Sequence, residues 1–380
     1  MKKEKANGQK GVALLITLFA ILIMTFLAVE IGYNTHVELK VGASQIDRLK
    51  AYYLAKSGVQ ISLLRINVFK QVMTKFGSQL GPNKSQLDLI WQFPFSWPPI
   101  LPPEASDLDK EQVKDSIKKS FIDGTFSTQI EGEGGKIDIN DLGSPSESLA
   151  KAVNAQLVQI IQNRLDKDDD WARDHRNLKP LEIVNNIADW VTEGNTGKNG
   201  GDKSAPYSHM EPAYTPPNRS MKTIEELHMV AGVSDEIFDL LAPRLTVYGI
   251  KGVNINLATK DVIRSVDKSI TDELAQAIID RRSDQQLGPF KDDKDFTTFV
   301  DQQHVVGDIS KFNTNPKIPL FYDSEYNFRI KSTGLFGKAQ REIVAIVYDF
   351  DKVKGQLSAE LASGSTRGVS KNKSFLRNTF

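Results

Sequence analysis

The first apolar segment of the chain begins immediately after Gly11. Val12–Val29 is apolar apart from two threonines, and the run to Ile31 reaches the roughly 20 residues that cross a bilayer as a helix. Four lysines and one glutamate precede this run. Positive charge marks the cytoplasmic end of a membrane helix, so everything after Ile31 is expected on the other side of the membrane. The pattern therefore predicts a single-pass transmembrane helix.

A second, amphipathic pattern continues directly from the first. Between Val37 and Met73 apolar residues recur at steps of three and four positions, charged residues fill the other faces, and no proline occurs before Gly81. This spacing predicts that the membrane helix continues as one long helix. At 1.5 Å per residue, Val12–Met73 would extend roughly 90 Å. We expect its inner half in lipid or a filament core and its outer half on a globular domain.

The rest of the pattern changes from strand to helix and back to strand. Alternation over Gly124–Glu133 predicts a strand, the spacing over Lys136–Arg282 predicts mostly helices, and Tyr326–Phe350 predicts a hairpin. This order predicts an α+β fold with a helical domain inserted into a helix-plus-sheet domain. Further expected elements are an irregular, aromatic-rich crossover at 77–103, a short helix at 108–121 and a disordered polar tail at 351–380.

An internal repeat occurs within the helical block. Lys136–Asn140 (Lys-Ile-Asp-Ile-Asn) and Gly252–Asn256 (Gly-Val-Asn-Ile-Asn) are similar. A Gln-x-Ile-Ile-x-Arg-like run ends 24 positions after the first asparagine, and a related run ends 25 positions after the second. Each unit predicts a strand end, an Asn turn and two helices, and two such units can stack into one core.

Composition limits the classes of protein that fit. The chain has no cysteine, so a domain outside the cytoplasm would depend on its hydrophobic core rather than on disulfides. The formal charge is zero. Without residues 1–11 the chain has 44 basic and 47 acidic residues, a net charge of −3. Neither value predicts a general attraction for nucleic acid.

The second repeat unit also resembles the helix-hairpin-helix units of membrane-anchored DNA-uptake proteins. Such units bind phosphate through backbone amides of a glycine-containing hairpin. Here the corresponding turn at Val266–Ile270 has no glycine and carries Asp267, and five nearby aspartates balance Arg281 and Arg282. We therefore expect a structural helical repeat and no nucleic-acid partner.

Two acidic segments are candidate metal sites. Asp166–Asp170 fails the EF-hand spacing, because Trp171 and Asn177 occupy the sixth and twelfth positions, so we expect a solvated helix end. The glycine-rich segment from Asp189 to Asp202 offers hard oxygen ligands of the kind that Ca²⁺ takes. From the residues alone, we interpret this segment as an ordinary polar loop rather than as a metal site.

No enzyme class is indicated by the sequence. The chain has no thiol nucleophile, and its five histidines form no His-x-x-x-His pair. No Walker, dinucleotide-binding or nucleophile-elbow pattern occurs. We expect a protein that is not an enzyme.

The junction at Gly11 places a small residue before the apolar run instead of after it. An ordinary secretory signal is cut after its apolar region, whereas a cut here would leave the apolar helix on the mature protein. This order resembles the type IV prepilin class. The resemblance implies cleavage between Gly11 and Val12 by a prepilin peptidase, with methylation. A simple type II membrane anchor is the alternative that the span alone permits.

Further motifs resemble the minor pseudopilin K family of type II secretion (general secretion pathway protein K), within the type IV pilin-like superfamily. Each motif is modest alone, but their order over residues 10–350 is specific. The matching segments are Lys10–Leu15, Lys50–Gly58, Gly135–Leu142, Ile187–Val191, Tyr207, Glu211–Asn218, Glu226–Leu227 and Asn254–Asn256.

The resemblance implies a fold and a location. The fold is pilin-like, a long N-terminal helix packed on a small antiparallel sheet, with a large inserted all-α domain of two helix-hairpin (SAM-like) repeats. The location is the bacterial inner membrane, with a single pass and the bulk of the chain in the periplasm. The expected segments are a prepilin leader (1–11), the transmembrane segment (12–31), the periplasmic part of the spine helix (32–76), the first part of the pilin-like domain (77–135), the inserted domain (136–320), the C-terminal strands (321–350) and the tail (351–380).

The resemblance also implies partners and a metal. The expected partners are the minor pseudopilins I and J, the prepilin peptidase and the inner-membrane secretion platform. The family binds Ca²⁺ in the loop after its Asp-Trp motif, but Thr192 and Gly194 stand where acids are expected, and Gly200–Lys203 replaces an Ala-Glu-Asp run. The remaining candidate ligands are Asp189, Glu193 and Asp202.

The fifth residue after the expected cut is informative. Most pilins have a glutamate there, which pairs with the N-terminal amine of a neighbouring subunit because a carboxylate in the membrane is costly alone. In this chain the position is Ile16. A subunit without that carboxylate is expected at the tip of a pseudopilus, where it starts or caps assembly for export across the outer membrane. The alternatives are a minor pilin of a type IV pilus and, less favoured, a membrane-anchored DNA-binding protein.

Overall fold

The computed structural model describes residues 9–77, 79–100, 106–120, 122–249, 251–284, 286–303 and 318–349. These residues form two compact groups, and each is described by itself. The expected tail at 351–380 and most of the expected leader lie outside the described residues. The first group comprises the chain up to Leu64, Pro94–Gln129 and Lys331–Val344, and the second comprises Arg65–Phe93, Ile130–Ile330 and the described residues from Ala345.

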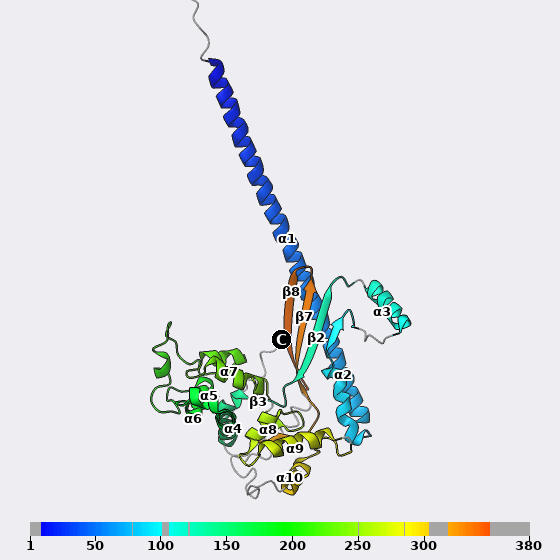
Figure 1. The fold of residues 1–380 in the computed structure, drawn as a ribbon, viewed down its shortest axis with the longest axis vertical. Helices are drawn as coiled ribbons and strands as arrows, with labels where there is room; N and C mark the ends of the chain where they lie inside the picture. Colours follow the sequence, from blue (N-terminus) through cyan, green and yellow to red (C-terminus); the bar gives the residue numbers. More distant parts are fainter. Residues whose placement is uncertain are drawn as a thin grey trace, which may run out of the picture. The chain divides into compact units, whose positions relative to one another are not determined.

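The longest element is α1, a helix of 68 residues from Gln9 to Phe76 (Figure 1). The prediction of one continuous helix is confirmed. Among the described residues, α1 is the one helix long and apolar enough to cross a membrane. Its apolar side chains from Val12 to Ile31 are exposed, and the hydroxyls of Thr17 and Thr25 donate to main-chain carbonyls one turn back, at 2.9 and 2.8 Å. These internal bonds satisfy the two polar groups without water, as a lipid environment requires.

A small antiparallel sheet forms the β part of the fold, with strand order β1-β2-β7-β8. Side chains alternate along β2, where Phe126, Thr128 and Ile130 are buried, so the predicted strand is confirmed. The predicted C-terminal hairpin is also present. The prediction for 77–103 missed β1, which pairs antiparallel with β2, because three residues between prolines carry too short a pattern to indicate a strand. The strands are β1 (Phe95–Trp97), β2 (Thr125–Gly132), β7 (Asn327–Phe336) and β8 (Ala339–Tyr348).

Within the first group, α1 approaches the sheet closely. Ala51 and Ala55 are fully buried on the contact face of the helix. A Cβ at Gly334 of β7 would lie 2.1 Å from the carbonyl oxygen of Ala51, so this close approach needs glycine. The hydroxyl of Ser332 donates to the carbonyl of Ala55 at 2.8 Å.

In the second group, the last turns of α1 carry an aromatic cluster. The rings of Phe69, Trp91 and Phe328 meet edge to face with centroids 5.2–6.3 Å apart. The Arg65 guanidinium donates to the carbonyls of Ile90 and Trp91 at 3.0 and 3.2 Å. These bonds hold the short helix α2 (Leu89–Gln92) against the same face of α1.

Most of the second group is helical, as the sequence predicted. Serine, threonine or aspartate caps the start of several helices, including Ser146 before α4, Ser234 before α7 and Thr271 before α9. A short helix, α3 (Asp107–Ser120), lies outside this group, at the position predicted for it. The helices are α4 (Glu147–Lys167), α5 (Asp169–Asp174), α6 (Pro180–Val191), η4 (Ile224–Met229), α7 (Asp235–Leu241), α8 (Lys260–Val266), α9 (Asp272–Ser283) and α10 (Asp293–Gln302).

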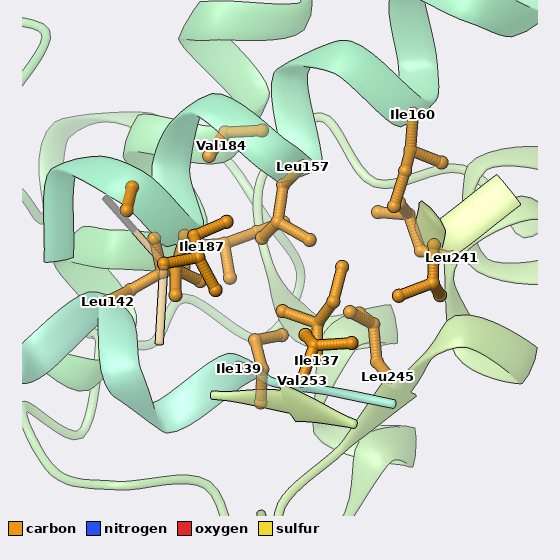
Figure 2. Packing of buried hydrophobic residues seen from close by; sticks show 14 of the residues in the cluster. Ile137, Ile139, Leu142, Leu157, Ile160, Val184, Ile187, Leu241, Leu245 and Val253 are labelled. Carbon is orange, nitrogen blue, oxygen red and sulfur yellow. The ribbon is translucent and has the colours of Figure 1, made fainter. Parts of the chain in front are cut away.

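One hydrophobic cluster joins these helices. Figure 2 shows side chains from α4, α6 and α7 pointing toward those of the short strands. Leu157, Ile187, Leu241 and Val253 are each at most 1% exposed. The core contains no disulfide, since the chain has no cysteine, and is held by apolar packing.

Two short pairs of parallel strands close the helical units. β3 (Ile137–Asp138) pairs with β4 (Leu245–Thr246), and β5 (Val253–Asn254) pairs with β6 (Leu320–Phe321). The sequence predicted β3 and β5 as strand ends but not their partners. Each partner strand lies more than 60 positions along the chain, and two residues cannot reveal a pairing over that distance.

An asparagine follows β3 and β5 and makes matching contacts in both places. Asn140 Oδ1 accepts the N–H of Met221 at 2.7 Å, and its Nδ2 donates to the carbonyls of Met221 and Val247 at 3.1 and 3.4 Å. Asn256 Oδ1 accepts the N–H of Phe290 at 2.9 Å, and its Nδ2 donates to the carbonyls of Phe290 and Tyr322 at 2.8 Å each. Each asparagine therefore ties the start of its unit to a later loop and to the residue after the paired strand.

Candidate functional site

The proposed calcium ligands Asp189, Glu193 and Asp202 lie in the last turn of α6 and in the loop that follows it. The apolar face of α6 is buried through Ile187, Trp190 and Val191, and this packing fixes the end of the helix. Asp189 is 5% exposed, and both of its carboxylate oxygens accept the backbone N–H of Lys198, at 3.0 and 2.9 Å. Burial raises the pKa of the Asp189 carboxyl. The carboxylate therefore holds the loop against the helix.

The loop folds back on itself through glycines. Gly194, Gly200 and Gly201 have φ angles of 96°, 89° and 77°, a region that residues with a side chain rarely adopt. The N–H of Gly197 donates to the carbonyl of Gly201 at 3.0 Å. This bond and the glycine turns bring the end of the loop back beside its beginning.

An asparagine and a lysine secure the loop further. Asn199 Nδ2 donates to the Glu182 carbonyl and to Asn186 Oδ1, both at 2.9 Å, and so ties the tip of the loop to α6. The backbone N–H of Lys203 donates to the Asn195 carbonyl at 3.0 Å. The loop is thus closed by its own hydrogen bonds.

The side chain of Lys203 lies inside this loop. Its Nζ donates to the carbonyl oxygens of Asp189 at 3.0 Å and of Thr192 at 2.8 Å, and also to the Thr192 hydroxyl at 3.1 Å and the Glu193 carbonyl at 3.4 Å. Burial lowers the pKa of the Lys203 ammonium. These carbonyls belong to the last turn of α6 and the residues after it, which lack partners within a helix. The ammonium satisfies them at the negative end of the helix dipole.

The three proposed ligands do not converge on one point. Asp189 faces Lys198, and the Asp202 carboxylate accepts the N–H and the hydroxyl of Ser204 at 2.8 and 2.7 Å, which lowers the pKa of Asp202. The side chain of Glu193 is exposed. In the part of the chain that the structure describes, no group of three or more His, Asp or Glu side chains is arranged to hold a metal ion. The loop as it stands does not fit a dication, and the calcium prediction stays untested.

Lys203 was not proposed as a site residue from the sequence. Lysine is rarely buried unless it has partners, so an exposed position is the default expectation for it. The sequence pointed to Lys203 only through its position at the end of Gly200–Lys203, the segment that stands where the family resemblance implies an Ala-Glu-Asp run. Its partners lie 10–14 positions earlier in the chain, and only the fold of the loop brings them together.

The other acidic candidate, Asp166–Asp170, serves the ends of two helices. Asp168 caps α5 by accepting the N–H of Trp171 at 3.0 Å and also pairs with Arg164 at 2.9 Å. Asp170 pairs with Arg173 at 2.8 Å. This arrangement fits the interpretation of a solvated helix end.

The two arginines of the second unit point into the protein. Arg282 donates to the carbonyls of Ile255 and Ala258 at 2.6 and 2.8 Å, and burial lowers the pKa of its guanidinium to about 10. Arg281 donates to the carbonyl of Gly288. In the turn between α8 and α9, Asp267 accepts the N–H and hydroxyl of Ser269. These groups are engaged within the chain, which disfavours a phosphate-binding hairpin.

The residues of the expected processing site lie at the start of α1. Gly11 and Val12 fall within its first turns, and Ile16 is 63% exposed on an apolar surface. Nothing in the structure tests cleavage at this bond. Cleavage of the peptide bond between Gly11 and Val12 therefore stays a prediction.

Comparison with known proteins finds similarity to a component of type II secretion. The family model for protein K of the type II secretion system matches residues 135–249. A curated protein of Escherichia coli strain K12, described as putative type II secretion system protein K, is 23% identical over 282 residues, which cover 73% of this chain and 76% of that protein. A crystal structure of the GspK-GspI-GspJ complex from the type 2 secretion system of enterotoxigenic Escherichia coli aligns with a TM-score of 0.40 and 14% identity, over 59% of this chain and 74% of that chain. The resemblance noted in the sequence is confirmed.

Proposed function

The chain is related to protein K of the type II secretion system, and on that premise we propose that it is a minor pseudopilin at the tip of the secretion pseudopilus. In this role it starts assembly with the other minor pseudopilins and so supports protein export across the outer membrane. The observation that carries the proposal is α1. One uninterrupted helix has an exposed apolar part and a part buried on an antiparallel sheet, in the same chain as the protein K match.

The architecture proposed for the rest of the chain follows the same premise. We propose that residues 136–320 form an inserted helical domain of two SAM-like repeats. The matching contacts of Asn140 and Asn256, each beside a parallel strand pair, support a duplicated unit. A domain of this size is too bulky to repeat along a closely packed helical shaft, which favours a position at the end.

The tip position also follows from Ile16. A glutamate at position 16, within the membrane segment, would need a positively charged partner, because an unpaired carboxylate in lipid is costly. Ile16 removes that requirement and gives no charge partner to the N-terminal amine of a neighbour. The subunit can therefore end a filament without leaving a charge buried in the membrane.

A stripe on α1 after the membrane segment is suited to partner helices. Leu39, Ile46 and Tyr53 recur every seven residues, with Leu49 between them, and all four are 56–68% exposed. A seven-residue apolar repeat on an exposed helix forms the seam of helix–helix packing. We propose that the N-terminal helices of the minor pseudopilins I and J occupy it.

The remaining features of the proposal concern location and processing. The chain is a single-pass inner-membrane protein with its bulk in the periplasm, cut between Gly11 and Val12 by a prepilin peptidase. It acts by assembly with the inner-membrane platform and not as an enzyme.

Co-purification tests the proposed partners. The full chain, co-expressed with I and J and extracted in detergent, should retain both through affinity purification. Ile46→Arg should lose them, because a charge in the seam has no counterpart. Ser44→Arg adds the same charge on the opposite face of α1 and should retain them. Retention of I and J by Ile46→Arg, or co-purification with pilus proteins instead, would contradict the assignment.

A further inference from the structure

The loop after α6 places a positive charge where several hard oxygen atoms meet. Lys203 is 6% exposed, and its ammonium lies within 2.8–3.4 Å of three main-chain carbonyls and one hydroxyl. Oxygens of these kinds are ordinary ligands of Ca²⁺. In this chain the protein's own side chain supplies the cation that they surround.

The distances identify the interaction as hydrogen bonding to an ammonium. Separations of 2.8–3.4 Å are typical of N–H···O bonds, whereas Ca²⁺ lies about 2.3–2.6 Å from each of six to eight oxygens. A dication at the same point would have to displace the ammonium, because two cations a few ångströms apart repel strongly where water is excluded. The lysine and a metal therefore compete for one place.

The carboxylates that would neutralise a dication are used elsewhere. Asp189 accepts the backbone N–H of Lys198 through both oxygens, and Asp202 holds Ser204 at the start of the following turn. Glu193 contributes its main-chain carbonyl to Lys203 while its side chain is exposed. The oxygens that are hydrogen-bonded to the ammonium are neutral and lie at the negative end of α6, and the nearby Asp189 carboxylate favours the charged form of Lys203. This environment suits a single positive charge.

We infer that Lys203 is the structural cation of this loop, that it takes the place which the family resemblance assigns to a metal, and that the loop is ordered without calcium. The ammonium joins the end of α6 (Asp189, Thr192) to the end of the loop. The loop geometry is therefore built into the chain and does not respond to the supply of divalent ions. This inference does not depend on the role of the chain in secretion.

Amide hydrogen exchange of the full chain in detergent tests the inference. In the wild type, the amides of Gly197 and Lys198 should exchange at the same rate in excess EDTA and in millimolar calcium chloride. In Lys203→Met, which keeps the length of the side chain but removes its charge, these amides should exchange about 10- to 100-fold faster in EDTA, because bonds to a charged donor hold the loop closed.

Two controls make the outcome decisive. Lys198→Met removes an exposed ammonium from the same loop and keeps the backbone N–H that binds Asp189, so its exchange should match the wild type. The amides of α4 report whether Lys203→Met is folded, and if they too exchange rapidly, the wild-type comparison alone decides. Slower exchange of the wild-type loop on adding calcium would overturn the inference. Unchanged exchange in a folded Lys203→Met would also overturn it.

Discussion

Gly58 of α1 lies so close to Ser332 of β7 that a Cβ at Gly58 would be 2.2 Å from the serine Oγ. The serine cannot turn aside cheaply, because its hydroxyl donates to the Ala55 carbonyl one turn earlier on the same helix. A Cβ would also lie 2.5 Å from the Thr128 methyl. Glycine at this position therefore sets how closely the spine helix packs on the sheet.

Gly58→Ala should destabilise the protein by about 1–3 kcal/mol, the usual cost of overpacking a tight contact. Unfolding of the full chain in detergent by denaturant, followed by tryptophan fluorescence, measures the change. Gly42→Ala is the matched control, because nothing lies within 4 Å of a Cβ there, and its better helix propensity should leave stability equal or higher. Equal midpoints for Gly58→Ala and the wild type would show that the contact is looser than described.

Asn256→Ala should cost about 1–3 kcal/mol, since it leaves the N–H of Phe290 and the carbonyl of Tyr322 without the side chain that binds them. Asn140→Ala should cost a similar amount by the equivalent loss at Met221. The same denaturation experiment measures both. Asn177→Ala, at an exposed position, is the control. A large effect at one asparagine and none at the other would argue against two equivalent units.

Stability should fall as the pH rises from about 4.5 to about 7 because of Glu325. Its carboxylate is buried and accepts the N–H groups of Gly134, Tyr326 and Asn327, yet burial raises the pKa of Glu325 to about 7. Over this pH range the unfolded state releases the Glu325 proton while the folded state keeps it. The stabilisation by protonated Glu325 is therefore fully present below about pH 4.5 and is lost as the pH rises through 7. The integrated loss is up to about 3 kcal/mol.

Glu325→Gln should flatten this part of the pH profile, because the amide does not titrate. The measurement is the free energy of unfolding of both proteins at several pH values. Burial also raises the pKa of Asp138 to about 7, so the informative quantity is the difference between variant and wild type. Glu225→Gln, at an exposed position, should keep the wild-type profile. Parallel profiles for Glu325→Gln and wild type would contradict the prediction.

Processing should remove residues 1–11. Intact-mass analysis of the chain from cells that contain prepilin peptidase should give a protein beginning at Val12. Gly11→Leu should keep the leader, whereas Gly8→Leu should be cut normally. An uncut wild type, or a cut after Val29, would exclude the prepilin assignment.

The elements that the sequence revealed are those with long periodic patterns. α1 could be recognised because its spacing continues for more than 60 residues, and β2 because Phe126, Thr128 and Ile130 alternate. The equivalence of Asn140 and Asn256 in the two units could be recognised from the repeated sequence motif. These signals are local, so they can be recognised in the sequence without knowledge of the fold.

The missed features depend on contacts between distant residues. Met221 and Phe290, the partners of the two asparagines, lie 81 and 34 positions away and carry no pattern of their own. Lys203 was missed for a related reason, since only the closed loop brings its ammonium to the carbonyls of Asp189 and Thr192. Side-chain chemistry indicated which residues could bind a metal but not that a lysine would take the place of one.

The position of the protein in assembled pseudopili tests the central proposal most directly. Pseudopili assembled with an epitope-tagged full chain can be labelled with gold-conjugated antibody and viewed by electron microscopy. The proposal predicts label at one end of each filament. Label distributed along the shafts would contradict it.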